Sequence, residues 1–196
     1  MPLITFTASS GGGKTSVMKR LLEEIPGSRL LRSGTTRAPR ASDAEGEYLY
    51  LAETEFLLRK ERSEFAWDAN FGSARYGTLK IDLRLALASD NTHFAAIVPQ
   101  IVPTLHEFAS VEGFATCVRS IYIKSPGRDI LLRRLTVDRG ESLELAMQKI
   151  EECASWDKIA INRRHNGRFA YLFVGDRDDF EEKYLSVLKD VNRPWF

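Results

Sequence analysis

The sequence predicts an α/β fold in which a parallel sheet carries helices on both faces. Two observations support this prediction: short, β-rich apolar runs recur along the chain, and segments with helical periodicity separate them. Such alternation favours strand-helix-strand connections, which build parallel sheets. The chain has 196 residues, 43% of them hydrophobic, which is enough for one compact core with small insertions.

The first expected element is a buried strand at Leu3–Ala8, which ends in a Ser-Ser-Gly-Gly-Gly stretch. A helix follows, because apolar residues recur there at spacings of three and four until Pro26 and Gly27 stop the pattern. Later buried strands are expected at residues 93–98, 119–123 and 171–174. Further helices are expected at residues 79–88, 130–135, 143–159 and 180–191.

Two charged regions interrupt this alternation. Over residues 32–85 we expect a small α+β insertion, with short aromatic and charged segments and a helix near residues 54–62. Residues 133–168 carry arginines at both ends around a helical pattern, which indicates a helical lid that covers a site. The core of the domain would then comprise residues 1–31, 86–132 and 169–196.

Charge and composition exclude several classes of partner. Lys and Arg number 28 against 27 Asp and Glu, so the net charge of +1 indicates neither a nucleic-acid nor a membrane partner. The two cysteines, Cys117 and Cys153, lack metal-ligand spacing and suit a reducing compartment. There is no signal-like N-terminus and no apolar run of about 18 residues, so we expect a cytoplasmic protein. The sequence does not indicate an oligomeric state.

The segment from Ala8 to Thr15 fits the Walker A phosphate-binding loop at every position except the first, where alanine replaces glycine. Its glycines allow successive N–H groups to face one phosphate, and the following helix adds its N-terminal partial charge. Lys14 would reach the β- and γ-phosphates of ATP, and the Thr15 hydroxyl would bind Mg²⁺. The alternative is a glycine-rich turn that only joins a strand to a helix. The residues predicted to bind ATP are Ser10, Gly11, Gly12, Gly13, Lys14, Thr15 and Ser16. The predicted fold is therefore of the P-loop NTPase type.

A second anion site is expected at residues 32–40, where arginines and hydroxyls cluster around Pro39. Arg37 and Arg40 offer planar forks to phosphate oxygens, and proline limits the freedom of the loop. Taken alone, each arginine is more typical of a solvated surface, but the neighbouring hydroxyls and Pro39 favour a phosphate site.

From residue 8 to residue 78 the chain resembles the guanylate kinase family. Residues 33–40 match the family's Ser-x-Thr-Thr-Arg-x-Pro-Arg signature, residues 46–48 resemble its Gly-x-Asp-Tyr, and residues 76–78 its Tyr-Gly-Ser/Thr. The resemblance implies that a phosphorylated acceptor is held by Ser33, Arg37, Arg40, Tyr48 and Tyr76, with Thr78 at the base of the site. For each tyrosine, plain packing is the alternative.

Residues 133–140 resemble the Arg-Leu-x-x-Arg-Gly of the family's lid, with one extra residue. The resemblance implies that Arg139 closes on the triphosphate and stabilises the charge of the transferred group. A solvated helix face would account for these charges equally well. The predicted catalytic residues are Lys14, Arg37, Arg40 and Arg139, with Thr15 on the metal and ATP and Mg²⁺ as cofactors.

The chain departs from the family pattern where guanine would be read. Trp67 stands at the position of the family's glutamate; a slip of one residue would bring Asp68 there, but would turn its side chain to the other face of the strand. In the central strand the family's two aspartates are replaced by Ala96 and Val98. The residues that bind phosphate are retained, whereas the carboxylates that read the base are not.

Two kinds of acceptor follow from this departure. The leading hypothesis is an ATP-dependent nucleoside monophosphate kinase that phosphorylates GMP, in which Trp67 also belongs to the acceptor site and stacks on a base or closes a smaller pocket. The alternative is a sugar-phosphate kinase, because residues 67–70 resemble the Trp-x-Ala-Asn of ribose bisphosphokinases. A non-catalytic scaffold that binds phosphorylated peptides is a second alternative, although such a scaffold predicts a ruined phosphate loop.

Overall fold

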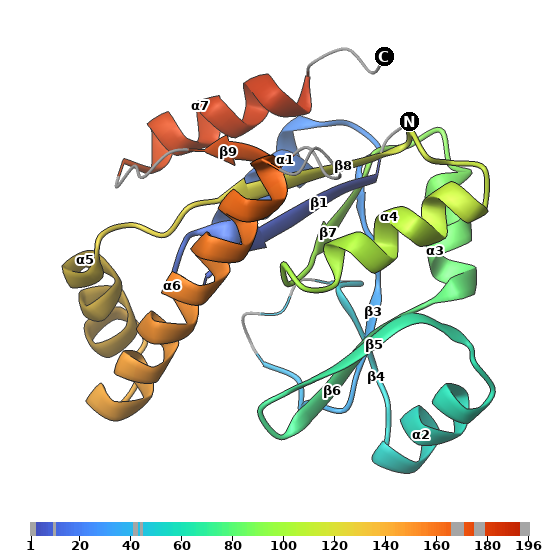
Figure 1. The fold of residues 1–196 in the computed structure, drawn as a ribbon, viewed down its shortest axis with the longest axis horizontal. Coiled ribbons are helices and arrows are strands. Elements are labelled where there is room, and N and C mark those ends of the chain that lie inside the picture. The colour runs from blue at the N-terminus through green and yellow to red at the C-terminus, as the bar shows by residue number, and fades with distance from the viewer. Residues whose placement is uncertain are drawn as a thin grey trace.

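The computed structural model describes residues 3–9, 11–40, 43, 45–165, 171–174 and 179–192 (Figure 1). Within them, five parallel strands form a central sheet in the order β2-β7-β1-β8-β9. The strands are β1 (Leu3–Ala8), β2 (Arg29–Leu30), β7 (His93–Ala96), β8 (Val118–Ile123) and β9 (Tyr171–Val174). Strand β1 lies in the middle, so the loop that follows it leaves from the centre of the sheet.

Helices cover both faces of this sheet, as the sequence predicts. Side chains alternate along β1, so Ile4 and Phe6 lie on the face that packs against α1 (Lys14–Glu24) and α7 (Phe180–Val191). Leu3 lies on the other face, in a cluster with apolar residues of α3 (Lys80–Leu87), α4 (Val102–Val111) and α6 (Leu143–His165). The predicted α/β fold is confirmed.

A second, smaller sheet forms beside the central one. Its strands run in the order β4-β3-β6-β5. They are β3 (Ser33–Thr35), β4 (Tyr48–Tyr50), β5 (Phe65–Phe71) and β6 (Ala74–Leu79). Helix α2 (Glu53–Glu61) covers one face, where Phe56 stacks on Phe65 with ring centroids 4.5 Å apart. Residues 33–79 thus form an α+β unit on one side of the molecule (Figure 1).

A helical segment projects on the other side of the molecule (Figure 1). It comprises α5 (Arg128–Arg133), the π-helix η1 (Arg134–Asp138) and the first turns of α6. A π-helix is uncommon and is often found near functional sites. The sequence predicts a single helix at 130–135, whereas the structure has α5 followed by η1. Residues 166–168, the end of the predicted lid, lie outside the described residues.

Other elements differ from the sequence prediction in extent. Helix α4 is not predicted, although Val102, Leu105 and Ala109 are buried at helical spacing. Pro103 lies in its first turn, where the missing N–H has no helical partner to lose. Strand β7 ends at Ala96, two residues early, and α6 continues six residues beyond the predicted residue 159. None of the described helices is both long and apolar enough to span a bilayer.

Candidate active site

The predicted phosphate loop turns from the centre of the sheet into α1. Gly11 and Gly13 have φ angles of 81° and 90°, a region that favours glycine, and the N–H of Gly12 donates to the carbonyl of Ser9 over 3.0 Å. Ala8 is the last residue of β1, where the backbone is extended, so an alanine fits the position at which the motif expects glycine. Ser10 lies outside the described residues.

Side chains from distant parts of the chain hold this loop. The buried Nζ of Lys183 in α7 donates to the carbonyl of Gly12 over 3.1 Å. Arg134 in η1 donates to the carbonyl of Gly11 over 2.9 Å. Sequence reasoning missed both contacts. The sequence does contain one indication that Lys183 is buried: it lies on the apolar face of α7, four residues before the buried Val187.

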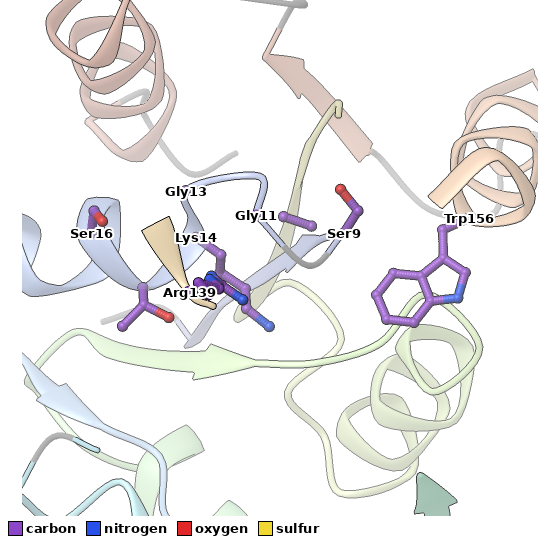
Figure 2. Close-up of a pocket in the computed structure, with 9 residues that line it drawn as sticks. Ser9, Gly11, Gly13, Lys14, Ser16, Arg139 and Trp156 are labelled. Carbon is purple, nitrogen blue, oxygen red and sulfur yellow. The ribbon is translucent and has the colours of Figure 1, made fainter. Parts of the chain in front are cut away.

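A cavity of about 300 Å³ opens at the loop (Figure 2). In Figure 2, Trp156 projects from α6 at one side of the loop and Ser16 lies on α1 at the other. Burial lowers the pKa of Lys14 below its ordinary value, and the charge of Glu47 opposes this shift. The cavity is lined by Ala8, Ser9, Gly11, Gly13, Lys14, Thr15, Ser16, Arg139 and Trp156. Of these, Trp156 was not anticipated from the sequence.

A second cavity, of about 570 Å³, lies between the small sheet and the helical segment. The predicted residues Arg37, Arg40, Tyr48 and Tyr76 line it. Thr15 and Arg139 line it as well, and both also line the cavity at the loop. The two predicted anion sites therefore adjoin each other. Residues of this cavity that the sequence did not single out as site residues are Asp43, Glu47 and Glu141.

Asp43 organises the arginine cluster of this second cavity. Its carboxylate accepts from the Arg37 guanidinium over 2.8 Å, and from the Arg40 backbone N–H and the Tyr50 hydroxyl over 2.7 Å each. Burial alone would raise the pKa of Asp43, but these hydrogen bonds outweigh it and hold the pKa at about 2. Arg37 also lies over the Tyr48 ring, 4.9 Å from its centroid. The Arg37 guanidinium is therefore held in place by both Asp43 and Tyr48.

The Tyr48 hydroxyl remains neutral at ordinary pH. Burial raises its pKa, and the neighbouring Glu47 raises it further. A neutral phenol is a hydrogen-bond donor to phosphate oxygens. The electrostatics of this residue therefore suit an anionic ligand.

The hairpin of β5 and β6 shows which residues face the second cavity. Residues directly opposite on paired strands share a face, and Ala69 pairs with Tyr76 while Trp67 pairs with Thr78. Since Tyr76 lines the cavity, these four side chains belong to the cavity face. Asp68 has the opposite orientation.

Asp68 forms an ion pair with Lys60 of α2, on the far face of the hairpin. The register slip that would bring a carboxylate to the position of Trp67 therefore does not occur. Trp67 is 7% exposed and Thr78 1% exposed; the indole Nε1 of Trp67 and the Oγ1 of Thr78 have no hydrogen-bond partner among the described residues. Neither residue lines the cavity itself, and neither does the predicted Ser33.

Comparison with known proteins decides the family. A family model described as guanylate kinase matches residues 1–191. The chain belongs to the guanylate kinase family. The guanylate kinase of Idiomarina loihiensis is 32% identical over 189 residues, which cover 94% of this chain and 83% of that protein. For the guanylate kinase of Chlamydia felis the identity is 30% over 198 residues, covering 96% and 86%.

The fold of the guanylate kinase family is seen in the same comparison. The crystal structure of guanylate kinase from Anaplasma phagocytophilum superposes with a TM-score of 0.63 at 22% identity, covering 97% of this chain and 84% of that chain. The resemblance in the sequence is thus confirmed, and so is the P-loop fold class. The comparisons favour neither a sugar-phosphate kinase nor a non-catalytic scaffold.

Proposed function

We propose that this chain is an ATP-dependent phosphotransferase that moves the γ-phosphate of ATP to GMP or a similar phosphorylated acceptor. One observation carries the proposal: Thr15 and Arg139 line both cavities, so a donor phosphate and an acceptor phosphate would meet between them. The membership in the guanylate kinase family supports the same reaction.

On the donor side, the phosphate loop binds the triphosphate. The N–H groups of residues 11–16 surround the phosphates, and Lys14 reaches the β- and γ-phosphates. Arg139, which lines both cavities, stabilises the charge on the group in transfer. These roles require little covalent chemistry, because phosphoryl transfer depends mainly on alignment and charge stabilisation.

The Thr15 hydroxyl is suited to bind magnesium. It is an oxygen donor at the start of α1 and lines both cavities, and oxygen ligands are those that Mg²⁺ prefers. The described residues contain no group of three or more His, Cys, Asp or Glu able to hold a metal ion. Thr15 would therefore share the ion with phosphate oxygens and water. When bound, Mg²⁺ neutralises charge on the β- and γ-phosphates.

On the acceptor side, side chains bind the acceptor phosphate. Arg37 and Arg40 offer their guanidinium groups, and Tyr48 and Tyr76 offer neutral hydroxyls. Ser33 and Thr78 belong to the strands beneath them. An acceptor phosphate is already an anionic nucleophile, so the site needs no strong general base.

The parts of the chain divide the work in this proposal. The core at residues 1–31, 86–132 and 169–196 binds ATP, the insertion at residues 32–85 binds the acceptor, and the lid at residues 133–168 brings Arg139 over both. Closure of such a lid excludes water from the transferred phosphoryl group.

The test is ATP consumption by the purified protein with Mg²⁺ and a panel of acceptors: GMP, dGMP, AMP, UMP and ribose 1,5-bisphosphate. GMP is expected to give the highest kcat/KM. If ribose 1,5-bisphosphate gives the highest kcat/KM, the proposal of a nucleotide acceptor is wrong. If ATP binds but no acceptor is phosphorylated, the phosphotransferase itself is wrong.

A pair of variants tests the role of Trp67 in the choice of acceptor. Trp67→Glu places a carboxylate on the cavity face of the hairpin, where it accepts hydrogen bonds from the N–H groups of guanine. The KM for GMP is expected to fall by about tenfold or more. The matched control is Trp67→Phe, which removes the indole N–H and adds no carboxylate. Equal effects of the two variants would contradict a base at this position.

A further inference from the structure

The phosphate loop rests on a buried lysine from the last helix. Lys183 is only 2% exposed, and its Nζ donates to the carbonyl of Gly12 over 3.1 Å. The same Nζ lies 3.5 Å from the position that a Cβ on Gly13 would occupy. The ammonium group therefore touches the middle of the loop from the side of α7.

This contact fixes the orientation of one peptide group. In a trans peptide the C=O and the N–H point in opposite directions, so holding the Gly12 carbonyl toward Lys183 aims the Gly13 N–H away from it. Glycine peptides are otherwise the most mobile in the chain. A loop that is held before its ligand arrives loses less entropy on binding.

Lys183 also lines a cavity beside the loop. This cavity of about 210 Å³ is also lined by Gly11, Gly13, Arg134 and Arg139, and by one acidic residue, Asp138. An ammonium group carries a large desolvation cost when it is buried, and a nearby anion offsets that cost. A bound triphosphate would be a further anion near this charge.

We propose that Lys183 is a positioning residue of the ATP site, which holds the Gly12–Gly13 peptide in its anion-binding orientation and adds a fixed positive charge behind the loop. The inference rests on the proposed function in that it takes a triphosphate as the ligand. Lys14 contacts the phosphates from the front of the loop, and Lys183 acts on them through the loop.

The test measures binding, not turnover. Calorimetry gives the dissociation constants of ATP and of inorganic tripolyphosphate for the wild type and Lys183→Met, which keeps the side-chain length and removes the charge. Both constants are expected to rise by about 10- to 100-fold, the usual effect of losing a charge-assisted hydrogen bond. Lys183→Gln, which keeps a donor without the charge, should lie in between. The matched control is Lys189→Met, an exposed lysine on the same helix, with constants within about twofold of the wild type.

Several outcomes would overturn the inference. A lower melting temperature of Lys183→Met with unchanged dissociation constants would make Lys183 purely structural. A loss for ATP without a loss for tripolyphosphate would make it a nucleoside contact. If both variants fail to fold, the ¹⁵N-labelled Nζ resonance of Lys183 in the wild type is expected to shift when tripolyphosphate is added, and a stationary resonance would overturn the inference.

The same data separate this inference from the proposed function. If tripolyphosphate binds through Lys183 but no acceptor is phosphorylated, the phosphotransferase fails and Lys183 keeps its role. If an acceptor is phosphorylated and both variants bind ATP as the wild type does, only the role of Lys183 fails.

Discussion

The two predicted anion sites of this molecule are built by different means. The loop after β1 presents its backbone, and its carbonyls are held from behind by Lys183 and Arg134. The predicted acceptor site presents side chains, and the carboxylate of Asp43 accepts hydrogen bonds from Arg37 and from the backbone of Arg40. A site made of backbone can bind almost any polyphosphate, whereas a site made of side chains changes its ligand when one residue changes. The departures from the family pattern at Trp67, Ala96 and Val98 all fall at positions where the family's carboxylates would read the base of an acceptor.

The largest effect is expected at the donor side. Lys14→Met removes the charge that reaches the transferred phosphate, so kcat should fall by about 10³-fold, as for other groups that stabilise charge in the transition state. Steady-state turnover with the best acceptor of the panel measures it. The control is Lys19→Met, since Lys19 is exposed on the same helix; this variant should leave kcat unchanged. A fall below about tenfold would mean that backbone alone carries the donor site.

Acid should affect the two halves of the molecule in different pH ranges. Nε2 of His106 in α4 lies 2.8 Å from Oγ of Ser120 in β8, and this Oγ accepts from the hydroxyl of Thr5 in β1. Burial lowers the pKa of His106 to about 4 from an ordinary 6.5. The unfolded chain thus binds the proton first, and stability present above about pH 6.5 is lost as the pH falls to 4. The loss is on the order of 3 kcal/mol.

Urea unfolding at a series of pH values measures this loss. His106→Gln should remove most of the slope between pH 6.5 and 4. Asp43→Asn is the control. The pKa of Asp43 is lowered from 3.8 to about 2, so the stability that Asp43 contributes is lost only as the pH falls from 3.8 to 2. If Asp43→Asn changes the pH dependence of the unfolding free energy between pH 6.5 and 4 and His106→Gln does not, then the loss of stability in this range arises on the acceptor side.

A smaller effect is expected at the acceptor side. Arg37→Met should raise the KM for the acceptor by about 10- to 100-fold, since one charge-assisted fork to phosphate is lost, and should leave the KM for ATP within about twofold. Initial rates with each substrate varied in turn give both values. Arg62→Met, an exposed arginine after α2, is the control. A parallel rise of both KM values would mean that the two sites do not act separately.

The sequence predicts the parts of both sites that follow from local patterns. A glycine loop between a strand and a helix predicts one phosphate site, and an arginine cluster around Pro39 predicts another, because this chemistry depends on neighbours in the chain. The joining of the two sites through Thr15 and Arg139 depends on tertiary structure, which local patterns do not contain.

The supporting contacts are the ones that sequence patterns miss. Lys183 lies 171 residues from the glycine that it holds, and a lysine in an amphipathic helix is ordinarily solvated. Asp43 is one acidic residue in a loop, and only its hydrogen bonds to Arg37 and Tyr50 show its role. Helix α4 is not predicted from the sequence; Pro103 lies in its first turn, which accepts a proline.

The smallest effect is expected where the chain departs from the loop motif itself. Ala8 is buried at the end of β1 and has extended backbone, so nothing in the loop requires glycine there. Ala8→Gly should lower the free energy of unfolding by about 0.5–1 kcal/mol through backbone entropy, and leave the dissociation constant of ATP within about twofold. Urea unfolding and calorimetry measure the two quantities. An ATP affinity that rises by more than tenfold would show that the alanine methyl distorts the loop, and that the donor site, like the acceptor site, has been altered by a single side chain.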